Sequence, residues 1–347
     1  MSVKENPFML TFGKQPGRLI ERYEMQDEIV TTFSAQNPVY QTYLIEGVRG
    51  SGKTVLMTAV SKMLEEDGWI VVDLNPSLNL LEDFALRLGK ACERIPGFLK
   101  QGFNISAFGF GVGVQGNTSR EDPVGLIEDC MQRLSKKGKR VLITIDEVIN
   151  DQNMRIFTSQ FQIFIRKDFP LFLIMTGLYE NIHNIQNDPQ LTFLLRSPKL
   201  RTEALSTFQI KNQYKEIFDL DDEKAMELAD ITKGYAFAFQ ALGKVYWDFR
   251  DKYEMEKILE KLDEMLDGYV YRKVWETLTP RERDIVSSME EGEMRVKDVL
   301  TGAGMKSDSF SKYREKLVGM GILSSPKYGY IYLTLPRLSI ISKTYKK

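Results

Sequence analysis

The sequence predicts an α/β protein: a three-layer domain with a parallel sheet, then an all-helical lid, then a small module of helices with a β-hairpin. Apolar runs short enough to be strands alternate with segments of helical periodicity, which is the pattern of a parallel sheet. Helical periodicity then dominates up to about Tyr271. The five predicted strands lie near residues 42–46, 69–74, 141–145, 171–175 and 199–204. The three predicted domains cover residues 1–204, 205–271 and 272–347.

Composition excludes several classes of protein. Of the 347 residues, 43% are hydrophobic and 27% charged, which is ordinary for a globular chain. Two cysteines and one histidine, His183, argue against a disulfide scaffold and a multi-histidine metal site. No stretch has the pattern of a signal peptide or a membrane helix. We therefore expect a cytoplasmic protein that does not enter a membrane.

The first strand leads into a phosphate-binding motif. The run Thr42–Glu46 is followed by G-x-x-x-x-G-K-T and then by a helical segment, the setting that this motif requires. The glycines let backbone N–H groups face a phosphate, and the helix N-terminus adds the positive end of its dipole. Lys53 is expected to reach the β- and γ-phosphates of ATP, and the Thr54 hydroxyl to ligate Mg²⁺. The predicted nucleotide-binding residues are Gly47, Val48, Arg49, Gly50, Ser51, Gly52, Lys53, Thr54 and Val55.

The third strand ends in two carboxylates. Val141–Ile145 is an apolar run followed by Asp146 and Glu147, the arrangement of a Walker B motif. Asp146 is predicted to orient Mg²⁺, and Glu147 to polarise the attacking water.

Two further residues are candidates for the catalytic site. Thr176 follows the fourth strand and is read either as a residue that holds the attacking water or touches the γ-phosphate, or as a helix cap or turn residue. Arg196 ends a short helical segment and is read either as an arginine finger for a neighbouring copy or as a surface arginine that pairs locally.

The order of these motifs resembles the AAA+ ATPases, and within them the bacterial and archaeal ATPase-domain proteins related to origin-recognition initiators and STAND signalling ATPases. The lead-in, with Asn6-Pro-Phe8, Phe12-Gly13 and Pro16–Ile20, and the segment Arg22–Ile29 are similar to that group. The resemblance implies that Ile20 and Tyr23 contact adenine. The motifs predict ATP or ADP with Mg²⁺ as the ligand, and a homo-oligomer is expected if Arg196 acts as an arginine finger.

The sequence departs from the group after Gly234-Tyr235. A proline normally follows there, whereas this chain has Ala236-Phe237, and no arginine is present to act as a second sensor. Nucleotide-driven closure of the lid is therefore expected to be weak or to use other contacts.

One segment does not fit the alternation of strands and helices. Residues 103–114 place apolar residues at alternate positions, which predicts an inserted β-hairpin. We expect either a hairpin that folds over the ATPase domain or a probe that contacts DNA or a partner.

The C-terminal region is predicted to be a winged helix-turn-helix. Thr279, Pro280 and Glu282 form a capping box with a proline start, ahead of a helix expected over 283–291 and a short one over 296–300. A helix over 307–319 then precedes a two-stranded wing. From residue 271 to 347 there are 15 Lys/Arg and 9 Asp/Glu, a local charge of +6 in a chain whose net charge is −1. On the last helix Ser309, Lys312, Tyr313 and Lys316 are expected to face outward, and Lys327 to lie at the tip of the wing. These five residues are the predicted contacts to duplex DNA.

Three functions remain open at this point. The leading one is an ATPase with slow turnover that couples nucleotide state to DNA binding through the winged helix. A second is a STAND-like signalling switch whose winged helix docks protein, since Asp308 and Glu315 weaken the case for DNA. The third is a nucleotide-binding scaffold with little turnover.

Overall fold

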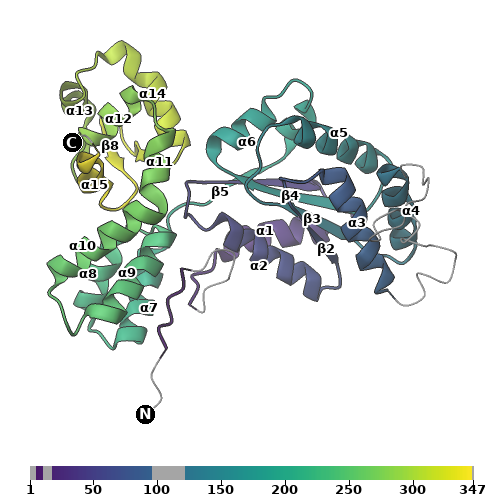
Figure 1. Cartoon of the computed structure of the whole chain (residues 1–347), viewed down its shortest axis with the longest axis horizontal. Helices are drawn as coiled ribbons and strands as arrows, with labels where there is room; N and C mark the ends of the chain where they lie inside the picture. The colour runs from purple at the N-terminus through teal and green to yellow at the C-terminus, as the bar shows by residue number, and fades with distance from the viewer. Residues whose placement is uncertain (1–4, 11–17, 96–121, 346–347) are drawn as a thin grey trace, which may run out of the picture. The chain divides into compact units, whose positions relative to one another are not determined.

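The computed structural model describes residues 5–10, 18–95 and 122–345. The chain divides into two compact units (Figure 1), each of which is described here by itself. Unit 1 comprises Met1–Arg22, Gly47–Val55 and Arg201–Lys347, and unit 2 comprises Tyr23–Glu46 and Leu56–Leu200. The segment with the phosphate-binding motif therefore groups with the C-terminal part of the chain. The division into three domains stays a prediction.

The predicted parallel sheet is confirmed. Its strand order is β2-β3-β4-β1-β5, and β1 pairs with β4 in a parallel register that places Ile45 opposite Thr176. The pairs β2–β3 and β3–β4 are parallel as well. The last strand is three residues shorter than predicted, and the fourth extends two residues further. The strands are β1 (Thr42–Glu46), β2 (Ile70–Leu74), β3 (Val141–Ile145), β4 (Leu171–Gly177) and β5 (Lys199–Arg201).

Helices cover both faces of this sheet, which gives the three layers that the sequence predicts. On one face α1 and α2 pack against side chains such as Tyr43 and Phe172. On the other face α3 to α6 pack against Leu44, Ile143 and Leu173. Alternate residues of each strand therefore enter opposite cores. The helices are α1 (Tyr23–Ser34), α2 (Lys53–Glu66), α3 (Leu80–Glu93), α4 (Pro123–Lys136), α5 (Gln152–Arg166) and α6 (Tyr179–Gln186), followed by the 3₁₀ helix η3 (Thr192–Arg196).

The predicted helical lid forms part of unit 1. Its core takes in Phe8 from the N-terminal segment, whose ring lies 5.6 Å from that of Phe218 and 5.8 Å from that of Phe239. The N-terminal segment is therefore a structural part of the lid. The lid helices are α7 (Thr207–Phe218), α8 (Asp222–Ile231), α9 (Ala236–Phe249) and α10 (Met255–Leu266), followed by the π-helix η4 (Asp267–Tyr271) and α11 (Arg272–Thr277).

The C-terminal module, residues 278–345, contains the predicted helices and hairpin. The capping box at Thr279 and Glu282 is present, and the helix over 307–319 has the predicted bounds. A short strand, β6, adds to the predicted wing and makes a three-stranded sheet in the order β6-β8-β7. The elements are α12 (Pro280–Ser287), β6 (Met294–Arg295), α13 (Val296–Gly302), α14 (Ser307–Gly319), β7 (Leu323–Ser324), β8 (Tyr330–Leu333) and α15 (Leu338–Thr344).

One helix of this module differs from its expected bounds, a second helix was not expected, and one predicted hairpin falls outside the described residues. The first helix runs over 280–287, not 283–291, because the proline at its first turn starts it. The terminal helix α15 was not predicted. The hairpin predicted at 103–114 lies outside the described residues. Within them, no helix is both long and apolar enough to cross a bilayer.

Candidate nucleotide-binding site

The segment Gly47–Thr54 has the backbone of a phosphate-binding loop, the P-loop. Gly50 and Gly52 have φ angles of 75° and 92°, which L-residues with a side chain rarely adopt. The helix α2 begins at Lys53, so its first N–H groups, which have no partner within the helix, lie at the end of the loop. The sequence motif and the loop conformation therefore agree.

Lys53 closes the loop on itself. Its ammonium donates hydrogen bonds to the carbonyl oxygens of Gly47 at 3.0 Å and Val48 at 3.1 Å, and the residue is only 8% exposed. A buried cation at this place favours an anionic ligand, because its charge is poorly screened by water.

Side chains from distant parts of unit 1 hold the P-loop from outside. The Tyr235 hydroxyl donates to the Arg49 carbonyl at 2.6 Å, and the guanidinium of Arg22 donates to the Ser51 carbonyl at 3.1 Å. The Ser51 and Thr202 hydroxyls lie 2.5 Å apart. Burial lowers the pKa of Arg22, and the charge of Glu203 partly offsets this effect. The ordinary pKa of a guanidinium is so high that the group stays charged.

Two glycines of the loop are required by these contacts, and one of them, Gly50, also by its backbone conformation. A Cβ at Gly47 would overlap the Thr202 hydroxyl, and a Cβ at Gly50 would overlap the Tyr235 hydroxyl. The glycines therefore allow side chains from β5's end and from the lid to approach the loop closely.

The Walker B turn follows β3. Asp146 accepts a hydrogen bond from the backbone N–H of Glu147 at 3.0 Å. Glu147 itself has a φ of 52°, a left-handed conformation that is uncommon for a residue other than glycine. The turn exposes the Glu147 side chain while Val148, the next residue, is buried. The predicted general base is thus presented by a tight turn at the strand's end.

Thr176 contacts the predicted Mg²⁺ ligand. Its hydroxyl donates to the Asp146 carboxylate, and the Glu147 N–H lies 3.4 Å from the same hydroxyl oxygen. Thr176 is fully buried and comes from β4, the strand beside β3. It therefore fixes the Walker B turn, and it is not the helix cap that the sequence left open, because α6 begins only at Tyr179.

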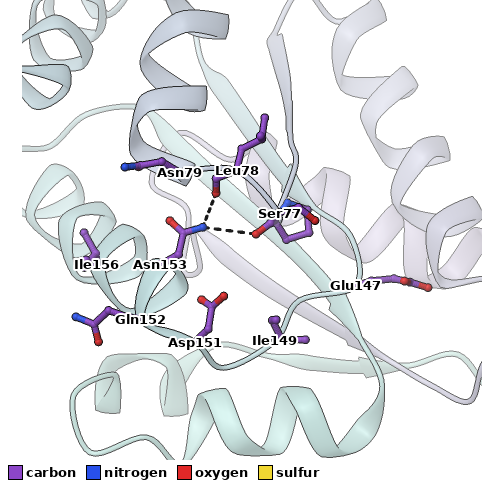
Figure 2. Close-up of a pocket in the computed structure, with 10 residues that line it drawn as sticks. Ser77, Leu78, Asn79, Glu147, Ile149, Asp151, Gln152, Asn153 and Ile156 are labelled. Carbon is purple, nitrogen blue, oxygen red and sulfur yellow. Dashed lines mark hydrogen bonds between the residues drawn. The ribbon is translucent and has the colours of Figure 1, made fainter.

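A cavity of about 660 Å³ lies beside the Walker B turn (Figure 2). It is lined by Glu147, residues 76–79, Ile149, residues 151–153 and Ile156. Asn153 organises its wall: the side-chain amide donates to the Leu78 carbonyl at 2.5 Å and accepts from the Leu80 N–H at 3.0 Å. Leu78, Ile149 and Ile156 are about half exposed around it. The lining of this cavity therefore combines an exposed carboxylate with apolar side chains.

A second cavity, of about 880 Å³, lies within unit 1. Its wall combines Gly47 and Val48 of the P-loop, Lys233 and Tyr235 of the lid, and Val318 of the C-terminal module. Lys233 also donates to the Leu333 carbonyl at 3.2 Å and forms a 2.5 Å ion pair with Glu291. The start of the P-loop, the lid and the module therefore share one wall.

The remaining predicted nucleotide-site residues have different surroundings. Ile20 is buried in the lid core, whereas Tyr23, the first residue of α1, is 64% exposed. Arg196 ends η3 and is exposed. Their roles in contacting adenine or a neighbouring copy stay predictions.

The described residues contain no group of three or more His, Cys, Asp or Glu that could hold a metal ion by themselves. Mg²⁺ in nucleotide sites takes few protein ligands and completes its shell with phosphate oxygens and water. Thr54 in unit 1 and Asp146 in unit 2 each carry an oxygen of the kind that Mg²⁺ prefers, and their role as its ligands stays a prediction.

The five predicted DNA contacts are not equivalent. Ser309 and Lys312 are exposed on α14, and within the described part of the chain no ion pair involves Lys312. Lys316, expected to face outward, is partly exposed, and its ammonium lies 3.1 Å from the carboxylate of Glu282, whose side chain is 2% exposed. Tyr313 is also partly buried and packs against the module's core. Lys327 is exposed but forms a 2.5 Å ion pair with Glu293.

Sequence reasoning missed the residues that hold the P-loop. Arg22, Thr202 and Tyr235 contact it across 29, 151 and 186 residues of chain. In the sequence, only Tyr235 was marked, because the departure from the AAA+ pattern lies next to it. Nothing in a local pattern identifies the other two.

Comparisons with known proteins place this geometry among ATPase folds. A family described as a domain of unknown function (DUF8462) matches residues 268–339. No curated protein matches the sequence. A Walker-type ATPase of Pyrococcus abyssi, PABY2304, is similar in structure with a TM-score of 0.63 at 14% identity, over 94% of this chain and 96% of that one.

Two further solved structures are similar. The ORC2 protein of Aeropyrum pernix, in ADPNP–ADP complexes, has a TM-score of 0.59 at 13% identity, over 96% of both chains. Cdc6p of Pyrobaculum aerophilum has a TM-score of 0.52 at 14% identity, again over 96% of both chains. Identities this low show the fold alone. The chain has the three-layer α/β fold of AAA+ ATPases.

Proposed function

We propose that this protein binds ATP with Mg²⁺ and hydrolyses it slowly to ADP and phosphate. The observation that carries the proposal is the P-loop: glycines in left-handed conformations, a helix that starts at its end, and a buried lysine inside it. The Walker B turn, with a carboxylate held by Thr176 and an exposed glutamate beside it, supports hydrolysis.

Each residue has a role in this reaction. Lys53 and the loop's N–H groups bind the β- and γ-phosphates and stabilise the negative charge that develops there. Thr54 and Asp146 would hold Mg²⁺, which neutralises charge on the phosphate oxygens when it is bound. Glu147 accepts a proton from the attacking water, and Thr176 keeps Asp146 in place. Arg196 would complete the site of a neighbouring copy in a homo-oligomer.

The first experiment compares wild-type protein with Glu147→Gln. We expect phosphate release to fall about 100-fold, as is usual for loss of a general base, with the dissociation constant for ATP changed less than two-fold. Glu66→Gln, an exposed carboxylate at the end of α2, is the matched control and should leave both quantities unchanged. ATP binding without phosphate release in the wild type would favour the scaffold with little turnover.

We further propose that the C-terminal module is a winged helix that engages duplex DNA in a nucleotide-dependent way. The order of its elements, helix, strand, helix, helix and hairpin, supports this, as do the exposed Ser309 and Lys312 on α14 and the local charge of +6. The ion pairs of Lys316 and Lys327 reduce the cationic surface and keep protein docking in a signalling switch as the alternative.

Anisotropy binding to random duplex DNA across a salt series, with ATP and with ADP, tests this step. Binding that weakens steeply with salt is expected, because phosphate contacts release counterions. Lys312→Glu should weaken binding about ten-fold, whereas Lys273→Glu, an exposed lysine on α11 outside the predicted contacts, should weaken it much less. No binding at low salt would leave protein docking as the role of the module.

A further inference from the structure

Three consecutive carbonyl groups of the P-loop are hydrogen-bonded from outside the loop. Arg49 accepts from the Tyr235 hydroxyl at 2.6 Å, and Gly50 accepts from the backbone N–H of Phe237 at 3.1 Å. Ser51 accepts from the Arg22 guanidinium at 3.1 Å. Two of the three donors belong to the start of α9 in the lid.

These bonds determine where the N–H groups of the loop point. A peptide unit is planar, so the carbonyl of one residue and the N–H of the next lie in one plane and point in opposite directions. Holding the Arg49 carbonyl therefore orients the Gly50 N–H, and holding the Ser51 carbonyl orients the Gly52 N–H. Gly50 and Gly52 are the two loop residues with positive φ, where the backbone would otherwise have the most freedom.

The surroundings of Tyr235 favour its hydrogen bond to the Arg49 carbonyl. It is 5% exposed and belongs to the lid core, and its ring lies 6.3 Å from that of Tyr271 in a stacked arrangement. Burial raises the pKa of Tyr235 far above its ordinary value, so the hydroxyl remains a donor at any working pH. A buried hydroxyl with one partner loses that bond only at a cost, because no water replaces it.

The contact lies where the sequence departs from the AAA+ pattern that it resembles. No proline follows Tyr235, and residues 236–240 include no arginine that could meet a phosphate. The start of α9 instead meets the P-loop through the Tyr235 side chain and the Phe237 N–H, and Ala236 lies close enough that a Cβ on Gly52 would come within 3.8 Å of its methyl.

We propose that Tyr235 is a positioning residue for nucleotide: by holding the Arg49–Gly50 peptide it keeps the Gly50 N–H aimed at the bound phosphate. This rests on the proposed binding of nucleotide to the P-loop. Tyr235 does not touch the phosphate. It couples the fold of the lid to phosphate affinity, and because coupling is reciprocal, bound ADP protects the start of α9 in turn.

The test compares Tyr235→Phe with Tyr271→Phe. Each substitution removes one buried hydroxyl that donates to a backbone carbonyl in unit 1, since Tyr271 donates to Pro336 at 2.8 Å. Only the first contacts the P-loop. Hydrogen–deuterium exchange of residues 47–55 is measured without nucleotide, the dissociation constant for ADP is measured by fluorescence, and the unfolding midpoint in urea is measured for both variants.

We expect Tyr235→Phe to speed exchange of the P-loop amides and to raise the dissociation constant for ADP, each about three- to ten-fold, the range that corresponds to one lost hydrogen bond. Tyr271→Phe should leave the P-loop exchange rate and the dissociation constant for ADP as in the wild type, although its unfolding midpoint is expected to be similar to that of Tyr235→Phe. In the wild type, ADP should slow exchange of residues 234–240. If Tyr235 had only a structural role, both substitutions would shift the unfolding midpoint, and the P-loop amides would exchange at the same rate in the two variants.

The outcomes separate this inference from the proposed function. If wild-type protein binds no nucleotide, the proposed function fails, and the inference fails with it. If nucleotide binds but P-loop exchange and ADP affinity are the same in Tyr235→Phe and the wild type, the positioning role is wrong while the proposed function stands. Equal changes in both variants would also overturn it, because the effect would then be general loss of stability.

Discussion

The P-loop and the Walker B turn follow two strands of one parallel sheet, yet they are held in different ways. The P-loop is bonded by Arg22, Thr202 and Tyr235, of which the last two lie more than 150 residues away in the sequence. The Walker B turn is bonded by Thr176 from the neighbouring strand β4. One element depends on the assembly of a whole unit, and the other on a single strand pair.

For the proposed ATPase, this difference predicts which contacts act on nucleotide binding and which act on turnover. If Tyr235 positions the P-loop as proposed, a change in the lid should change the affinity of the loop for phosphate. A turn held by its own sheet keeps its geometry as long as the sheet is folded, because adjacent parallel strands have a fixed register. Mutations on the two sides should therefore separate binding from turnover.

The largest effect is expected for Lys53→Met. Loss of the ammonium removes charge-assisted hydrogen bonds to phosphate and should raise the dissociation constant for ATP at least about 100-fold. Fluorescence titration with labelled ATP measures it. Lys62→Met, further along α2 and exposed, is the control. An unchanged affinity would mean that nucleotide does not bind at the P-loop.

A smaller effect, on turnover, is expected for Thr176→Val. The substitution keeps the shape of the side chain and removes the hydroxyl that bonds Asp146, so phosphate release should fall about ten-fold at saturating ATP. The dissociation constant for ATP should change less than two-fold. Thr176→Ser retains the hydroxyl and should restore most of the rate. A main effect on affinity instead would contradict the separation of the two sides.

The smallest effect is expected for Thr202→Val on the other side. Removing the hydroxyl bonded to Ser51 should raise the dissociation constant for ATP about three-fold, with the rate at saturating ATP unchanged. Thr158→Val, which removes a buried hydroxyl on α5 that donates to the Met154 carbonyl at 2.6 Å, serves as the matched control and should leave the dissociation constant unchanged. Loss of rate without loss of affinity would show that the P-loop contacts do not act on binding.

Local signals in the sequence predicted much of the fold. The strands at 42–46 and 141–145 and the helix at 307–319 have the predicted bounds, because apolar periodicity and start signals reside in neighbouring residues. The same holds for the capping box at Thr279. Weaker signals did not suffice. The two-residue strand β6 was not predicted, and the first helix of the C-terminal module runs over 280–287 where 283–291 was expected.

The candidate site was predicted only in its motif residues. Lys53, Asp146 and Glu147 follow from short patterns whose chemistry is local. The ion pair of Lys316 was not predicted, because its partner, Glu282, lies 34 residues away and is buried by the packing of α12 against α14. A spacing of residues along one helix does not reveal which charges the neighbouring helix supplies.

The sequence by itself determined that this chain has a parallel α/β sheet with a P-loop after one strand and paired carboxylates after another. Glycine spacing, strand-length apolar runs and helix starts are properties of adjacent residues, and they act in any context. The tertiary structure alone decided that Tyr235, Arg22 and Thr202 hold the P-loop, and that Thr176 holds Asp146. Such contacts form only when folding brings distant segments within hydrogen-bond distance, and no local pattern records them.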